Sequence, residues 1–188
     1  MPRAGLTPDR VVTEASDLAD LEGYGRLTLA ALAERLGVRQ PSLYKHIDSL
    51  DGLQRSMSVQ AKRELGAVLG RAAVGRSGPD AVRSLADAYR QWVLEHPGRY
   101  AATVRAPEPG DVEDKAVSDE LVRLVVDVLA GFGLTGNEAI DAARSLRAAI
   151  HGFVSLESAQ GFGLPRQVSR SYQFLIDTMI VGFHNRQP

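Results

Sequence analysis

A short polar segment of the chain offers residue types that can read nucleic acids. From Arg35 to Ile47 there are three basic residues and one histidine, and there is no acid. We expect seven side chains of this segment to point outward or sideways: Arg39, Gln40, Pro41, Ser42, Tyr44, Lys45 and His46. Arginine and glutamine can form paired hydrogen bonds with base edges, whereas lysine, serine and tyrosine can bond phosphate oxygens. The segment therefore predicts a surface that fits the major groove of double-stranded DNA.

Two short helices are expected to position these side chains. Thr28 can cap the first helix, and Gly37 can adopt the positive φ that a tight turn requires. The second helix begins near Pro41 and buries Leu43 and Ile47, so that its N-terminal end reaches the bases. This pattern favours a helix-turn-helix, but a plain helical hairpin with a polar surface would share it.

Other kinds of chemistry have little support in the sequence. The chain has no cysteine, which excludes disulfides, thiolate metal sites and cysteine nucleophiles. The four histidines, at positions 46, 96, 151 and 184, do not have the spacing of metal ligands. No glycine-rich phosphate loop, nucleophile elbow or catalytic triad stands out. We therefore expect no metal, no cofactor and no enzymatic activity.

The composition is that of an ordinary globular protein. The chain has 188 residues, of which 44% are hydrophobic and 24% charged, and its net charge is -1. Since phosphates act over a Debye length of roughly 8–10 Å, the local charge matters more than this total. No stretch approaches the roughly 20 apolar residues of a membrane span, and the first ten residues lack the apolar core of an export signal. We expect a cytoplasmic protein that does not bind membranes.

Apolar spacing predicts about nine helices and no strand. The first helix begins at Thr7 and Pro8, and the long helices that follow the two short ones are expected at 49–71, 79–96, 112–131, 135–161 and 165–184. The expected fold is all-α. An N-terminal three-helix DNA-binding domain covers 1–52, the helix 49–71 links the domains, and a C-terminal domain covers 53–188.

The N-terminal segment resembles the DNA-binding domain of the TetR family. The resemblance lies in Leu29-Ala-Ala-Leu-Ala-Glu-Arg-Leu-Gly-Val-x-x-Pro-Ser-Leu-Tyr-x-His-Ile, followed by Leu53. It implies that Thr28 and Tyr44 contact phosphates and that four residues lie nearest the bases, namely Arg39, Gln40, Pro41 and Lys45. It also implies a homodimeric repressor that a small-molecule inducer of unknown identity releases from operator DNA.

One residue departs from the family pattern. Members usually carry a lysine that touches DNA near the start of the fourth helix, and Leu50 takes its place here. Asp48 and Asp51 lie on either side of Leu50. Either backbone amides alone make this phosphate contact, or the affinity for DNA is modest.

The C-terminal half also resembles a TetR subfamily, through Trp92, the segment from His96 to Tyr100 and the segment from His151 to Leu156. Its aromatic residues can be ordinary core, or they can enclose an apolar ligand pocket beside nearby glycines. The candidate ligand-binding residues are Trp92, Tyr100, Arg105, Phe132, His151 and Phe153, with Tyr100, Arg105 and His151 as polar groups.

The last helix carries a regular apolar stripe. Its residues include Tyr172, Leu175, Ile176, Met179, Ile180 and Phe183. The stripe can be core within one subunit, or it can pair with the helix 135–161 in a four-helix bundle between two subunits. Together with the resemblance, the length of both helices favours the bundle and hence a homodimer.

Three alternatives to a ligand-released repressor have to be weighed. An activator or a ligand-independent regulator would have the same fold. A helical small-molecule-binding protein with weak or vestigial DNA binding would agree with Leu50 and with the balanced charge of residues 1–65. An enzyme is disfavoured because no catalytic constellation is present.

Overall fold

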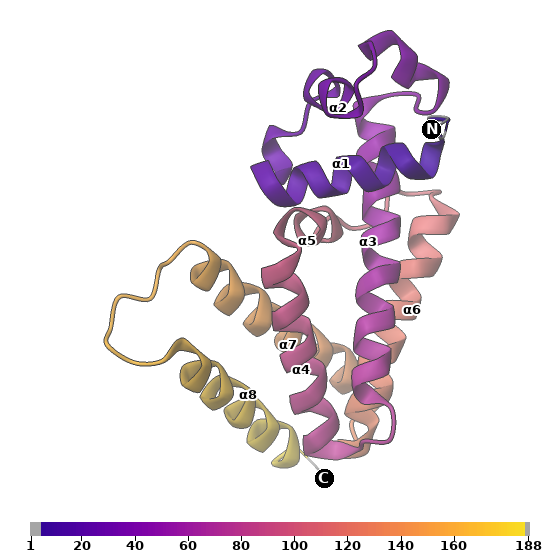
Figure 1. Ribbon diagram of the computed structural model, residues 1–188. Coiled ribbons are helices and arrows are strands. Elements are labelled where there is room, and N and C mark those ends of the chain that lie inside the picture. Colours follow the sequence, from indigo (N-terminus) through magenta and orange to yellow (C-terminus); the bar gives the residue numbers. More distant parts are fainter. Residues whose placement is uncertain (1–4, 187–188) are drawn as a thin grey trace. The chain divides into compact units, whose positions relative to one another are not determined.

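The computed structural model describes residues 5–186. We expect no export signal in the first ten residues, and residues 1–4 of that segment lie outside the described part. Within 5–186 the chain forms eight α-helices and three short 3-10 helices, with no strand (Figure 1), which confirms the all-α fold. In chain order they are α1 (Pro8–Glu22), η1 (Tyr24–Arg26), α2 (Leu29–Leu36), η2 (Gln40–Lys45), α3 (Leu50–Ala73), α4 (Gly78–Glu95), α5 (Pro97–Thr103), α6 (Val112–Leu129), η3 (Ala130–Phe132), α7 (Gly136–Ser158) and α8 (Val168–His184).

Side-chain caps fix the starts of the N-terminal helices where the sequence predicts them. Thr7 accepts a hydrogen bond from the Arg10 amide at 3.2 Å, and Thr28 accepts one from the Ala31 amide at 3.1 Å. Ahead of α3, Ser49 accepts from the amide of residue 52 at 2.9 Å. Each cap satisfies one of the backbone donors that a helix start leaves without an intrahelical partner.

The helices pack into two compact units that are discontinuous in sequence. Within the described residues, the first unit contains 5–64 together with 95–118, and the second contains 65–94 together with 119–186. Helices α3 and α6 each run from one unit into the other. The domain boundary near residue 52 stays a prediction, but α5 and the first turns of α6 clearly pack with the N-terminal helices.

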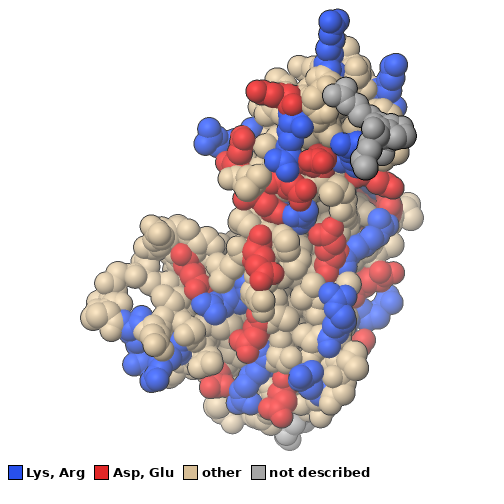
Figure 2. Space-filling view, viewed as in Figure 1, with Lys and Arg blue, Asp and Glu red and all other residues tan. Residues whose placement is uncertain are grey.

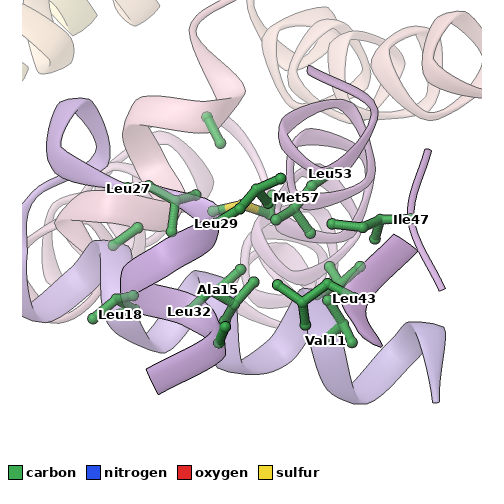
Figure 3. Close-up of a cluster of buried hydrophobic side chains, with 14 residues drawn as sticks. Val11, Ala15, Leu18, Leu27, Leu29, Leu32, Leu43, Ile47, Leu53 and Met57 are labelled. Atoms are coloured by element: carbon green, nitrogen blue, oxygen red, sulfur yellow. The ribbon is translucent and has the colours of Figure 1, made fainter. Parts of the chain in front are cut away.

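An apolar core holds the N-terminal elements together (Figure 3). Val11 and Ala15 of α1, Leu32 of α2, Leu43 of η2 and Leu53 of α3 all have 0% exposure. Burying a leucine side chain contributes roughly 1.5–3 kcal/mol. Every element near the predicted DNA surface is therefore anchored to the same core.

Helix α5 lies against α1 at unusually short range. Gly98 packs on the backbone of Ala19 and Asp20, where a β-carbon would overlap the Ala19 carbonyl group. The next residue, Arg99, donates from its backbone amide to Asp20 at 2.8 Å and from its guanidinium to Asp17 at 2.6 Å and to Asp20. The close approach and the ion pairs together fix α5 on the C-terminal half of α1.

The second unit is built around buried aromatic residues. Tyr172 of α8 is 1% exposed, and its hydroxyl donates to the Ala86 carbonyl of α4 at 2.6 Å. Arg90 of α4 stacks over the Tyr172 ring, 5.1 Å from its centroid, and pairs with Glu157 of α7 at 2.8 Å. Burial raises the pKa of Tyr172 far above its usual value. These contacts hold α4, α7 and α8 together.

Within residues 5–186, no helix is both long enough and apolar enough to cross a membrane.

We expect Gly98→Ala to lower the free energy of unfolding by about 1–3 kcal/mol, because the new methyl group must push α5 away from α1. Chemical denaturation followed by circular dichroism measures this change. Gly70→Ala is the matched control, since Gly70 lies within α3 and a β-carbon there meets nothing within 4 Å. The control variant should be as stable as the original or more stable by up to about 1 kcal/mol. Equal stability of the two variants would contradict the packing argument.

Candidate nucleic-acid interface

The turn between α2 and η2 has the geometry that the sequence predicts. Gly37 adopts a left-handed conformation with φ 66° and ψ 33°. Its amide donates to the Glu34 carbonyl at 3.0 Å, and the Val38 amide donates to the Ala33 carbonyl at 3.0 Å. Because residues with a β-carbon are strained at this φ, glycine allows α2 to end sharply and the chain to turn into η2.

The second helix of the motif is shorter and tighter than expected. Instead of an α-helix from Pro41, the chain forms the six-residue 3-10 helix η2. The Ser42 amide donates to the Arg39 carbonyl at 2.8 Å and the His46 amide to the Leu43 carbonyl at 2.8 Å, both with three-residue spacing. Pro41 has no amide hydrogen to donate, and Ser49 already caps the next helix, so there is little room for a longer α-helix.

The predicted outward and inward faces of η2 are both confirmed. Leu43 is 0% exposed and Ile47 is 9% exposed, and both belong to the core of the first unit. Tyr44 is 52% exposed. Of the other residues expected on the DNA surface, five are exposed and two are half-buried: Thr28, Arg39, Gln40, Pro41 and Lys45 are exposed, and Ser42 and His46 are half-buried.

The charges of this surface differ in how free they are to bind a ligand. Arg35 is held by Glu14 of α1 at 2.9 Å. In the described part of the chain no carboxylate forms an ion pair with Arg39 or Lys45. Figure 2 shows lysine and arginine side chains projecting from the end of the first unit that α2 and η2 form. Two of the three basic residues of the segment are thus available to DNA phosphates or bases.

The start of α3 carries no cation of its own. Leu50 is half-buried and packs against the core of the first unit, while Asp48 and Asp51 are exposed. A cation from elsewhere in the chain pairs with this helix start, because Arg105 contacts Asp51 at 3.2 Å. Sequence patterns give no signal for this pair, since 54 positions separate the two residues.

The six predicted ligand-binding residues do not form one group. Arg105 belongs to the first unit, is 59% exposed and pairs with Asp51 and Glu108, and its assignment to a ligand site stays a prediction. Tyr100 also belongs to the first unit and is buried. In the second unit, Trp92 is buried and His151 is half-buried.

The two predicted phenylalanines of the second unit make different aromatic contacts. The Phe132 ring lies 5.9 Å from the Phe183 ring, and the Phe153 ring lies 5.2 Å from the Tyr172 ring and 4.8 Å from the Phe162 ring. Phe132 is 0% exposed and belongs to the packed interior, whereas Phe153 is half-buried.

The apolar stripe of α8 lies mostly inside the chain, which corrects part of the predicted dimer surface. Exposure is 1% for Tyr172, 3% for Ile176 and Ile180, and 6% for Phe183, so these side chains have no surface left for a partner. Leu175 and Met179 are half-buried and keep some accessible surface.

Other large apolar side chains of α7 and α8 are exposed. Phe174 and Val181 of α8 are 74% and 57% exposed, and Leu156 of α7 is 52% exposed. Phe174 and Val181 are seven residues apart, two helical turns, and therefore lie on one side of α8. The seven-residue spacing of Phe174 and Val181, offset from the buried stripe, is the sequence signal that could have identified this exposed side of α8.

The first unit also contains a polar surface cleft of about 430 Å³, with walls from α1, α3 and α6. Its lining residues are Asp9, Thr13, Arg55, Ser56, Val59, Gln60, Arg63 and Glu113. None of them is among the predicted ligand-binding residues. Residues 5–186 contain no group of histidines and carboxylates that could hold a metal ion.

Two family descriptions match the chain along most of its length. Residues 11–55 match the bacterial regulatory proteins of the tetR family, and residues 82–179 match the tetracyclin repressor-like C-terminal domain. Two curated relatives are similar over most of this chain. One is the HTH-type transcriptional regulator Rv0681 of Mycobacterium tuberculosis, 41% identical over 82% of this chain and 71% of its own length. The other is the HTH-type transcriptional regulator YobS of Bacillus subtilis, 35% identical over 96% of this chain and 94% of its own length.

Solved structures show the same fold. A TetR variant from Acinetobacter baumannii AYE in complex with minocycline superimposes with a TM-score of 0.75, at 19% identity over 98% of this chain and 99% of that one. Apo ActR from Streptomyces coelicolor superimposes with a TM-score of 0.68, at 19% identity over 97% of each chain. The fold and the helix-turn-helix define a DNA-binding transcriptional regulator. This chain belongs to the TetR family.

The loop between α5 and α6 is attached to α3 through ion pairs. Asp111 caps α6 by accepting from the Asp114 amide at 3.0 Å, and Arg55 of α3 donates to both of its carboxylate oxygens at 2.6 Å. The hydrogen bonds from Arg55 hold the pKa of Asp111 well below its usual value, with a smaller contribution from the backbone amides. Arg63 and Arg55 lower the pKa of Glu113 in the same way.

We expect Asp111→Asn to lower stability at neutral pH and to flatten its decline in acid. A carboxylate whose pKa is lowered on folding adds stability above its unfolded pKa of about 3.9, and this contribution disappears as the pH falls toward the folded value. Melting temperatures at pH values between about 7 and 2 measure the effect. Asp127→Asn, at an exposed position of α6, is the control and should keep the original profile. An unchanged acid profile for Asp111→Asn would show that the Arg55 pair contributes nothing to stability.

Proposed function

We propose that this chain is a homodimeric repressor that binds a specific operator through η2 and leaves it when a small molecule binds. The observation that carries the proposal is the geometry of η2. Its apolar side is fixed by Leu43 at 0% exposure, and its polar side presents Arg39 and Lys45 without carboxylate partners. A rigidly held helix with free cations and an amide is what base readout and phosphate contact require.

Within this surface we assign different roles to different side chains. Arg39 and Gln40 stand at the entry to η2, where a helix end reaches base edges. Lys45 and Tyr44 come at its end and bind phosphates, as a flexible ammonium group and a phenolic hydroxyl can do. Thr28 is exposed, but its hydroxyl oxygen already accepts the Ala31 amide, so we assign its phosphate contact to the hydroxyl hydrogen.

A dimer follows from the size of the reading surface. One six-residue helix makes too few contacts for tight binding, and two copies related by two-fold symmetry double them. The exposed apolar face of α7 and α8 is the surface that we assign to the partner subunit, with Phe174 and Val181 at its centre. The operator is then quasi-palindromic, with half-sites about one helical turn apart.

Release by a small molecule is supported by the family and by one structural neighbour. The TetR variant from Acinetobacter baumannii was solved in complex with minocycline, and its fold matches this chain. We assign the ligand of this chain to the second unit, where Trp92, His151 and Phe153 remain the candidate contacts. A ligand releases DNA only by preferring a conformation that fits the operator less well, and a coupling of about 1–3 kcal/mol changes affinity roughly 5–150-fold.

A repressor of this kind acts in the cytoplasm.

Selection of genomic DNA fragments by the purified protein tests the proposal as a whole. Enrichment of one quasi-palindromic sequence, including fragments near the protein's own gene, supports a specific regulator. Retention of all fragments alike favours weak or vestigial DNA binding. Such binding depends on phosphate contacts, so it should be lost as the salt concentration rises from roughly 50 to 200 mM.

For the recognition surface, we expect Gln40→Ala and Arg39→Ala each to cost about 1–3 kcal/mol of operator binding and to relax base preference at one position. Lys45→Ala should weaken binding to all sequences alike and reduce the salt slope by roughly one unit per contact. Fluorescence anisotropy with operator and scrambled duplexes measures both effects. Lys115→Ala, at an exposed lysine of α6, is the control and should bind like the original protein. If Gln40→Ala and Arg39→Ala both bind unchanged, η2 does not read the operator.

For assembly, we expect Phe174→Glu to give a folded monomer that no longer binds operator tightly. Ile176→Glu should instead lower the melting temperature, because it places a charge in the core of one subunit. Sedimentation equilibrium gives the oligomeric state, and circular dichroism melts show whether each variant is folded. Val122→Glu, at a 51% exposed position of α6, is the control and should remain dimeric. A dimer that persists in Phe174→Glu would place the interface elsewhere.

A further inference from the structure

Arg105 occupies a position between three segments of the first unit. It follows α5, in the loop that leads to α6. Its guanidinium donates to Asp51 in the first turn of α3 at 3.2 Å and also to Glu108 within its own loop. Tyr24 of η1 lies close enough to this pair to feel both charges. Burial raises the pKa of Tyr24, the positive charge of Arg105 lowers it, and the negative charge of Asp51 raises it.

The backbone that carries Arg105 is firmly anchored although the guanidinium itself is exposed. Lys62 of α3 donates to the Arg105 carbonyl at 3.4 Å, and the same ammonium group pairs with Asp114 at 2.5 Å. Lys62 and Asp114 are only 4% and 7% exposed, so this ion pair is shielded from solvent. Asp111 is held by Arg55 at 2.6 Å a few residues further on. The loop therefore keeps the Arg105 side chain close to the start of α3.

Asp51 lies near the proposed DNA surface. Asp51 follows Lys45 by six positions, which limits the distance between their α-carbons to about 20 Å even for an extended chain. Leu53, two residues after Asp51, and Leu43 of η2 belong to the same apolar core (Figure 3). A bare carboxylate here would repel phosphates whose field extends roughly 8–10 Å. Asp48 adds a second exposed negative charge to the same helix start.

We propose that Arg105 is a positioning residue for DNA binding, whose charge offsets that of Asp51 at the start of α3 and so weakens a repulsion between this helix and the DNA backbone. This inference rests on the proposed function. It gives the loop between α5 and α6 a part in operator binding without contact with any base. The effect is electrostatic, so it applies to every DNA sequence and weakens as salt is added.

The test compares Arg105→Gln with the double variant Arg105→Gln, Asp51→Asn. We expect the single variant to bind operator and scrambled DNA about 4–25-fold more weakly at low salt, because each of two subunits loses an interaction that is worth about 2–5-fold. The double variant should regain most of this loss, since the unpaired carboxylate is gone. Arg105→Lys should keep nearly the original affinity because it keeps the charge.

Arg83 of the second unit supplies a matched control. It too is an exposed arginine that bridges a nearby aspartate, Asp80, and a distant one, Asp177 at 2.8 Å. Arg83→Gln removes one positive charge and the same kind of surface pairs, and it should leave DNA affinity within about twofold. Melting temperatures of all variants show whether any of them is unfolded.

The outcomes separate the inference from the proposed function. If the original protein binds no DNA at low salt, both are overturned. If it binds operator and Arg105→Gln binds equally well, the inference alone is overturned. A weakened Arg105→Gln that Asp51→Asn does not rescue, or whose loss is the same at high salt, also overturns it, because charge compensation requires both the rescue and the salt dependence.

Discussion

The proposed DNA-reading surface depends on the burial of a few apolar side chains beneath η2. A six-residue 3-10 helix has too few hydrogen bonds to hold its shape in water, so its position comes from the core below it. Leu43 and Ile47 attach η2 to α1 and α3, and Gly37 sets the angle at which the chain enters. These contacts leave five exposed side chains, those of Arg39, Gln40, Pro41, Tyr44 and Lys45. The same burial that folds the first unit therefore also selects the residues that we propose to meet DNA.

The pattern of ion pairs, rather than an excess of positive charge, determines which basic side chains of this protein are available to a ligand. The net charge is -1, yet Arg39 and Lys45 have no carboxylate partner in the described chain, whereas Arg35, Arg55 and Arg63 are each held by an acid. Basic residues of α3 serve to attach the α5–α6 loop, and the cations of η2 are left for another molecule. A local binding surface can therefore exist in a chain whose overall charge gives no sign of it.

The sequence predicted the fold and the N-terminal motif because their signals are local. Caps, a glycine turn and apolar spacing act within a few residues, as at Thr28 and Gly37. It did not predict the 3-10 character of η2, or which side of α8 faces the core, because Tyr172 and Phe174 are both aromatic and only tertiary packing separates them. Ion pairs between distant segments, such as the one between Arg105 and Asp51, leave no local pattern at all.

The discontinuous first unit limits how this protein can be divided. The N-terminal helices share their packing with α5 and with the first turns of α6, which are encoded more than thirty residues downstream. A gene fusion that exchanged only the segment ahead of α4 would place a foreign α1 against α5, at the site where Gly98 allows close approach. The N-terminal helices of this molecule are therefore not a self-contained cassette, and the operator specificity that we assign to η2 should change more readily through substitutions there than through exchange of this segment.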